Sequence, residues 1–175
     1  MVTKTARIRF LSRSLALAAA LACSLSAAHA QLAKGSAFPS LANAGLVGTL
    51  PDSQGKVTLV DFWASWCAPC KASFPVYSKI QQDFSAKGLV IIAVSVDEDP
   101  ASYASFIDKH KPLFPTVHDA EHRLVAEVDV PTMPTSYLID RSGKVRFVHV
   151  GFHGDSTDRE LRTEIAALLD EKAAP

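Results

Sequence analysis

Two cysteines, Cys67 and Cys70, stand near the middle of the sequence with only Ala68 and Pro69 between them. An apolar run ends just before them, and the residues after them have helical spacing. Cysteines placed across the first turn of a helix are close enough to form a disulfide with each other. The unpaired backbone N–H groups at that end of the helix also favour a thiolate. The spacing therefore predicts a redox-active pair of thiols.

Other roles for a Cys-x-x-Cys pair are less well supported by the sequence. A zinc site needs a second pair of ligands. His118 and His122 are four residues apart, but Asp119 and Glu121 between them indicate a turn. A structural disulfide that closes so short a loop adds little constraint to the unfolded chain. We therefore expect no metal site and no cofactor.

Asp61 is an acid in an otherwise apolar segment just before the cysteines. A buried carboxylate resists ionisation, which raises its pKa and suits it to proton transfer. We expect Asp61 to be catalytic; the alternative is an acid at a strand end that reaches solvent. Trp66 is expected to flank the site and help a partner to dock, whereas Trp63 is expected to lie in the core.

The segments around the cysteines alternate between strand and helix patterns. Val57–Ala64 and Leu89–Val96 are nearly continuous apolar runs, typical of strands that are covered on both faces. Between them, Lys71–Ala86 has apolar side chains at helical spacing, and Pro75 inside it predicts a kink. Strand, helix and strand in this order predict a βαβ unit with parallel strands.

The rest of the chain contains shorter elements. The segment 31–54 has poor periodicity, and short edge strands are expected at 44–49. The elements expected after the βαβ unit are a helix opened by 97–100, a strand at 114–118, a helix at 122–128, strands at 136–140 and 144–150 joined by a hairpin turn, and an amphipathic helix at 155–172.

The first thirty residues have the pattern of a secretory signal. Basic residues precede the apolar run Leu15–Ala22, and Ala28-His29-Ala30 offers small residues at the positions that a signal peptidase reads. We expect cleavage after Ala30, which leaves one domain, 31–175, in a periplasm-type compartment. The alternatives are an uncleaved membrane anchor and a lipoprotein attached at Cys23.

The charge balance gives no sign of a strongly charged partner. The 175-residue chain has 18 basic and 18 acidic residues. Four of the basic residues lie in 1–30, so 14 basic and 18 acidic residues remain in 31–175, a balance of about −4. Nothing in this balance suggests nucleic acid or an anionic membrane surface as a partner.

Two motifs resemble those of a known superfamily. The segment Val60-Asp61-Phe62-Trp63-Ala64-Ser65-Trp66-Cys67-Ala68-Pro69-Cys70-Lys71 resembles the active-site segment of the thioredoxin superfamily. Met133-Pro134-Thr135, followed by a strand pattern, resembles its cis-proline loop. The spacing is similar to that of the exported TlpA/ResA-like branch, in which an extra helix and strand, here within 100–129, precede that loop.

The resemblance covers roughly Gly35–Lys172. It implies an α/β, thioredoxin-like fold, with a central mixed β-sheet flanked by helices and an extra helix–strand insertion before the cis-Pro loop. It also implies that Pro134 follows a cis peptide bond and presents the backbone of Met133 to a substrate; the alternative is a trans proline in a plain turn. The residues expected to contact substrate are Trp66, Ala68, Pro69, Met133, Pro134 and Thr135.

Roles for the two thiols follow from their positions and from the resemblance. Cys67, at the mouth of the helix, is expected to be exposed and to attack with a lowered pKa, and Cys70 is expected to resolve. Asp61 matches the thioredoxin aspartate that deprotonates the resolving thiol. The sequence departs from both relatives: Ala93 stands where thioredoxin has a lysine, and Ser73 where ResA-like proteins have a glutamate.

The resemblance implies a thiol–disulfide oxidoreductase. The exported branch mostly reduces disulfides in exported proteins, takes electrons from a membrane thiol reductase, and often serves cytochrome c or copper-site maturation. A periplasmic disulfide oxidase or isomerase would use the same residues with a more acidic Cys67. A copper(I) chaperone, with Met133 joining the cysteines, is a further alternative. A peroxiredoxin would need a Pro-x-x-x-Thr-x-x-Cys site, which the sequence lacks.

Overall fold

A computed structural model describes residues 32–171, so the expected signal segment 1–30 lies outside the described residues. The strands are β1 (Val57–Trp63), β2 (Leu89–Ser95), β3 (Thr116–His118), β4 (Thr135–Ile139) and β5 (Val145–Val150). The α-helices are α1 (Ala68–Phe84), α2 (Pro100–His110), α3 (Arg123–Val128) and α4 (Asp155–Asp170). Two short 3-10 helices, at Leu41–Asn43 and Ser85–Lys87, complete the order. Among the described residues, no helix is long and apolar enough to span a membrane.

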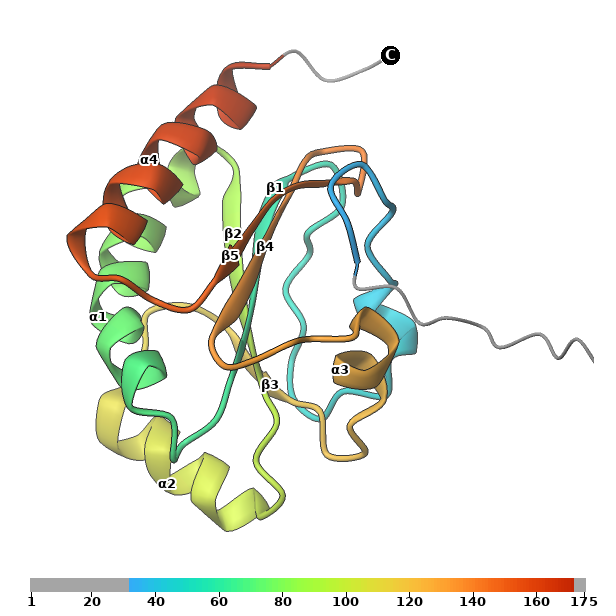
Figure 1. The fold of residues 1–175 in the computed structure, drawn as a ribbon, viewed down its shortest axis with the longest axis vertical. Helices are drawn as coiled ribbons and strands as arrows, with labels where there is room; N and C mark the ends of the chain where they lie inside the picture. The colour runs from blue at the N-terminus through green and yellow to red at the C-terminus, as the bar shows by residue number, and fades with distance from the viewer. Residues whose placement is uncertain (1–31, 172–175) are drawn as a thin grey trace, which may run out of the picture.

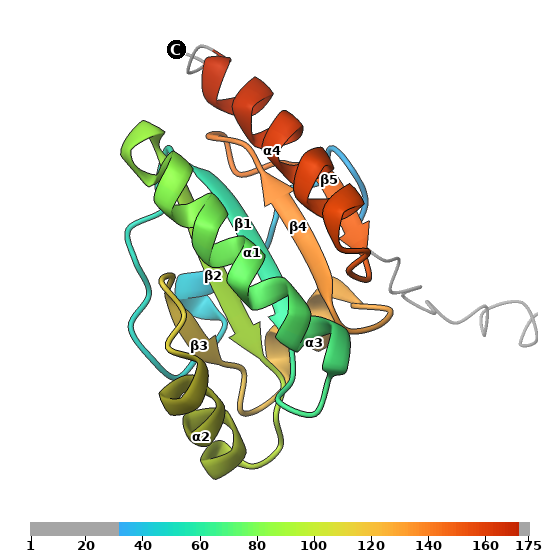
Figure 2. The ribbon, with the colours of Figure 1, turned by 90° about the vertical axis from the view of Figure 1, so that its left-hand side faces the viewer.

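The strands form one mixed sheet in the order β3-β2-β1-β4-β5. β1 pairs in parallel with β2, and β2 with β3, whereas β4 runs antiparallel to β1 and β5 to β4. Figure 2 shows α1 crossing in front of this sheet with α4 beside it. The predicted thioredoxin-like architecture is confirmed, including the inserted segment α2–β3–α3 before the proline loop.

Apolar side chains cover both faces of the central strands. Successive side chains of a strand point to opposite faces. In β1, Leu59 and Trp63 face α1, α2 and α4, whereas Val60 and Phe62 face α3 and the N-terminal segment. Figure 1 shows α1, α2 and α4 on one side of the sheet, and α3 with the N-terminal segment on the other side. The continuous apolar run in β1 is thus explained by burial on both faces.

The N-terminal segment 32–56 covers the second face of the sheet. The edge strands expected at 44–49 are wrong: within the described residues, this segment forms only single bridges, Val47 with His118 and Ala37 with Lys144. Its apolar side chains pack against the buried residues on the face of the sheet that carries Val60 and Phe62; they are Leu32, Phe38, Leu41, Leu46 and Leu50. They are spaced irregularly because the segment is made of turns, bends and one short 3-10 helix, without a regular repeat.

Helix α1 begins three residues earlier than the predicted Lys71. Cys67 is its N-cap residue, and Pro69 stands in the first turn, where the missing N–H of a proline costs no hydrogen bond. Pro75 lies inside the helix on its exposed side. The helix passes into a 3-10 turn that ends at Gly88, whose φ of 103° is in the left-handed region that suits glycine. Cys67 therefore caps a 17-residue helix, and Cys70 lies in its first turn.

The two tryptophans give a matched test of this packing. The Trp63 side chain is 0% exposed, with ring centroids 4.8 Å from Phe74 and 4.5 Å from Phe106, whereas Trp66 is 70% exposed. We expect Trp63→Ala to lower the free energy of unfolding by about 3–5 kcal/mol. The change for Trp66→Ala should stay within about 0.5 kcal/mol. Urea denaturation of the oxidised proteins measures both, and equal losses would contradict the assigned core.

Candidate active site

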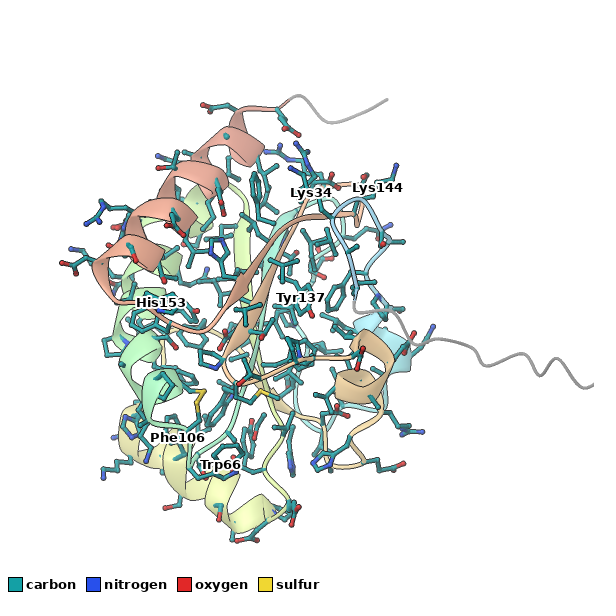
Figure 3. All side chains as sticks on the ribbon, in the orientation of Figure 1. Lys34, Trp66, Phe106, Tyr137, Lys144 and His153 are labelled. Atoms are coloured by element: carbon teal, nitrogen blue, oxygen red, sulfur yellow. A yellow bond between two sulfur atoms is a disulfide. The ribbon has the colours of Figure 1, made fainter. Side chains whose placement is uncertain are left out.

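Cys67 and Cys70 lie at the junction between β1 and α1. They are joined by a disulfide, with their Cα atoms 5.3 Å apart. The Cys67 Sγ also accepts the backbone N–H of Cys70 at 3.2 Å, so it caps the helix. Figure 3 shows the disulfide in yellow at the same end of the molecule as the labelled Trp66 and Phe106. Both sulfurs therefore lie at the positive end of the α1 dipole.

The expectation that Cys67 is exposed is wrong for this disulfide form. Cys67 is only 4% exposed, because its sulfur faces Cys70 and the first turn of α1. The exposed positions belong to its neighbours Trp66, Ala68 and Pro69. A partner would therefore meet this rim before it meets the sulfur.

Asp61 lies on the face of the sheet that α1 covers, in a row with Ala93 of β2 and Ser136 of β4. Ala93 is its neighbour in the strand register, as the comparison with thioredoxin implied. The Ser136 hydroxyl donates to Asp61 Oδ1 at 2.6 Å, and the Tyr77 hydroxyl, from α1, donates to the same oxygen at 3.3 Å. The two hydroxyl oxygens are 2.9 Å apart.

The environment of Asp61 places its titration near neutrality. Burial raises the pKa of Asp61 to about 7, and the hydrogen bonds from Ser136 and Tyr77 limit the rise because they favour the carboxylate. Within residues 32–171, the second carboxylate oxygen, Oδ2, is buried without a hydrogen-bond partner. Burial, and next the Asp61 charge, raise the pKa of Tyr77 well above its usual range, so its hydroxyl keeps its proton. Asp61 is therefore a buried acid able to gain or lose a proton near pH 7.

Sequence reasoning missed the hydroxyl groups around Asp61. Tyr77 belongs to the apolar stripe of α1, where an aromatic residue looks like ordinary core, and Ser136 looks like an ordinary strand residue. Ser73, which stands in the glutamate position of ResA-like proteins, is also buried, and its hydroxyl donates to the Cys70 carbonyl at 2.9 Å. The available signal was the helical spacing that places Ser73 and Tyr77 on the same buried face as Cys70.

The loop before β4 contains the predicted cis peptide bond between Met133 and Pro134. Met133 is partly buried and packs against the apolar clusters on both faces of the sheet, and Pro134 is buried. Thr135 is buried as well, and its hydroxyl donates to the Thr132 carbonyl at 2.8 Å, so this side chain holds the loop together. Contact between this loop and a substrate stays a prediction.

The histidines that were considered as zinc ligands have other partners. The Nε2 atoms of His118 and His122 donate to the backbone carbonyls of Asp97 and Val96, at 2.6 and 3.1 Å. In the part of the chain that the structure describes, no three side chains from His, Cys, Asp and Glu are grouped to hold a metal ion. The site thus offers two cysteines that form a disulfide and, under the same helix, a buried acid.

Comparisons with known proteins agree with this geometry. A model of the Redoxin family matches residues 30–165. The thiol-disulfide oxidoreductase ResA of Bacillus subtilis strain 168 is 35% identical over 102 residues, which are 58% of this chain and 57% of that protein. ResA of Geobacillus thermodenitrificans is 31% identical over 123 residues, 69% of this chain and 71% of the relative. The chain thus spans little more than half the length of the Bacillus subtilis relative.

Solved structures with the same fold extend the likeness over most of the described residues. A putative thiol:disulfide interchange protein DsbE from Chlorobium tepidum has a TM-score of 0.74 and 36% identity, covering 79% of this chain and 99% of that one. The thioredoxin domain of a thiol-disulfide oxidoreductase from Bacteroides vulgatus has a TM-score of 0.66 and 25% identity, covering 77% and 99% of the two chains.

The pKa of Asp61 predicts how stability depends on pH. Because this pKa is about 7 in the folded protein and near 3.8 in the unfolded chain, only the folded protein holds the proton between these values. Stability should therefore fall as pH rises from about 4 to 7. We expect Asp61→Asn to remove this fall, so that at pH 8 the variant exceeds the wild type by up to about 4 kcal/mol.

Urea denaturation of the oxidised wild type and variant at a series of pH values measures this difference. Other titrating groups contribute equally to both proteins and cancel in the comparison. A difference that stays constant from pH 4 to 8 would show that Asp61 keeps an ordinary pKa.

Proposed function

The chain belongs to the Redoxin family and is a ResA-like member of the thioredoxin superfamily, and on this basis we propose that it is a thiol–disulfide oxidoreductase that reduces disulfides in exported proteins. One observation carries the proposal. A disulfide-forming pair, Cys67 and Cys70, caps the N-terminus of α1, and an acid that titrates near pH 7 is buried under the same helix.

In the proposed first step, the Cys67 thiolate attacks one sulfur of a substrate disulfide. A bond forms between Cys67 and that sulfur while the substrate S–S bond breaks, and the second substrate sulfur leaves as a thiolate that takes up a proton. The N-terminus of α1 favours the Cys67 thiolate because unpaired N–H groups and the helix dipole point toward its sulfur. Trp66, Ala68 and Pro69 form the rim that would receive the substrate, together with the loop at Pro134.

In the second step, Cys70 loses its proton and attacks the Cys67 sulfur. The Cys67–Cys70 disulfide forms, the bond to the substrate breaks, and the substrate leaves as a dithiol that is reduced by two electrons. We assign the acceptance of the Cys70 proton to Asp61, whose pKa of about 7 lets it take up a proton and release it again near neutral pH. Ser136 and Tyr77 stabilise the carboxylate between these events.

The proposed setting is a periplasm-type compartment. It is supported by the signal-like segment 1–30, followed by the domain 31–175, and by the likeness to ResA and DsbE. Each turnover leaves the protein oxidised, so a donor of two electrons must reduce the Cys67–Cys70 disulfide again. We propose a membrane thiol reductase as this donor, and cytochrome c or copper-site maturation as the process served.

A trapping experiment tests the function and the roles of the two thiols. In Cys70→Ser, the attack that releases the substrate is lost, so the mixed disulfide at Cys67 should accumulate. We expect this variant to retain substrate proteins covalently through Cys67 and to release them with dithiothreitol. Non-reducing gels with mass spectrometry detect them. The matched control Cys67→Ser should retain none; capture by the control alone would reverse the two roles.

The redox potential tests the direction of the reaction. The residues between the cysteines, Ala68-Pro69, resemble the Gly-Pro of thioredoxin, so we expect a potential nearer to about −270 mV than to the −120 mV of strong oxidants. Equilibration of the pair with glutathione buffers measures it. A value near the oxidising end would favour an oxidase. Tight copper(I) binding without reduction of insulin disulfides would favour a copper chaperone.

A further inference from the structure

Asp97 is a second buried acid near the cysteines, and the reaction described above does not use it. It lies two residues after the end of β2 and is only 2% exposed. Its carboxylate accepts the Ser65 hydroxyl at 2.7 Å, the Ser65 backbone N–H at 2.9 and 3.1 Å, and the Ser95 hydroxyl at 2.8 Å. Three donor groups thus converge on this one carboxylate, and two of them belong to the residue two positions before Cys67.

Ser65 belongs to the short connection that carries the chain from β1 into α1. In this connection, the Cys67 N–H donates to the Ala64 carbonyl at 3.1 Å, which makes a tight turn around Ser65 and Trp66. Ser65 itself is tied to the rest of the protein by its hydrogen bonds to Asp97, whereas Cys67 is held directly to α1 by the backbone N–H groups of Cys70 and Lys71. Asp97 thus fixes the residue from which the chain turns into Cys67, so it adds to the contacts that place the Cys67 sulfur at the helix N-terminus.

Asp97 is itself held from its far side by the inserted segment. His118, at the end of β3, donates from Nε2 to the Asp97 carbonyl at 2.6 Å and stacks on Tyr103 of α2 with ring centroids 5.2 Å apart. His122, just before α3, holds the adjacent Val96 carbonyl at 3.1 Å. Because the backbone of Asp97 is fixed in this way, its carboxylate is a rigid anchor and not a mobile surface acid.

We propose that Asp97 is a positioning residue for the attacking thiol: by clamping Ser65, it holds Cys67 where the first N–H groups of α1 stabilise the thiolate. This inference rests on the proposed function, because it takes Cys67 as the attacking sulfur. A buried charge that only stabilised the fold would affect unfolding alone. A positioning role also predicts slower reaction of the Cys67 thiol in protein that is fully folded.

The test is the rate at which iodoacetamide alkylates Cys67 in the reduced full-length chain, between about pH 5 and 9, where protein thiols titrate. Mass spectrometry of the peptide that contains Cys67 follows this residue alone. Asp97→Asn keeps the shape of the side chain but exchanges one accepting oxygen for an NH2 group, so at least one donor loses its partner. We expect alkylation at pH 7 to slow about tenfold, the equivalent of one charge-assisted hydrogen bond, with the profile moved to higher pH.

Two further variants separate position from charge. Glu98→Gln removes the same charge from the exposed neighbouring residue and should change the rate by no more than about twofold. Ser65→Ala removes one hydrogen bond to Asp97 and should slow alkylation in the same direction but less. Because Asp97 acts through Ser65, the double variant should be little slower than Asp97→Asn alone. Ser65→Ala also keeps the inference testable where Asp97→Asn does not fold.

Each outcome decides the question. If Asp97→Asn lowers the melting temperature but alkylates as fast as Glu98→Gln, the positioning role is wrong. Faster alkylation of Asp97→Asn would mean that Asp97 acts on the thiol through its charge, which also overturns the inference. The proposed function is judged separately on the wild type: a Cys67 that reacts no faster than free cysteine would contradict that function, whereas a reactive wild type with unchanged variants contradicts only the role of Asp97.

Discussion

The burial of the Asp61 carboxylate under helix α1 is the constraint to which the rest of the site is fitted. A carboxylate removed from water must find donors or take up a proton. Here the sheet supplies Ser136 and the helix supplies Tyr77, both on the same carboxylate oxygen, and the second oxygen has no partner among residues 32–171. Burial raises the pKa of Asp61 to about 7, and the two hydrogen bonds keep it from rising further. They also tie the strand that carries the acid to the helix that carries the thiols.

Much of this arrangement was readable from the sequence because it follows from local patterns. The apolar runs of β1 and β2 and the helical spacing of α1 each reflect burial that repeats at a fixed interval. The sequence predicts Trp63 in the core and Trp66 at the surface, and the structure confirms both positions. Asp61 was singled out because an acid in an apolar strand breaks the pattern, and the neighbouring Ala93 followed from the resemblance.

The remaining features depend on contacts between distant segments, which no local pattern records. Tyr77 meets Ser136 across 59 positions, and Ser65 meets Asp97 across 32. The N-terminal segment covers a sheet face without any periodicity of its own. The burial of Cys67 was missed for a different reason: a helix N-cap is usually open to solvent, but in this disulfide the sulfur turns inward to Cys70. The sequence thus identifies the cysteines and the buried acid better than it identifies the distant side chains that contact them.

The inserted segment 100–129 contacts the backbone beside Asp97, although it begins thirty residues after Cys70 in the sequence. Two of its three histidines, His118 and His122, donate to the backbone carbonyls of Asp97 and Val96, so the insertion supports the backbone next to the Asp97 carboxylate that binds Ser65. A minimal version of the fold would be designed by deleting this inserted segment. In this molecule, removing the insertion would also remove the hydrogen bonds from His118 and His122 that support the backbone beside Asp97.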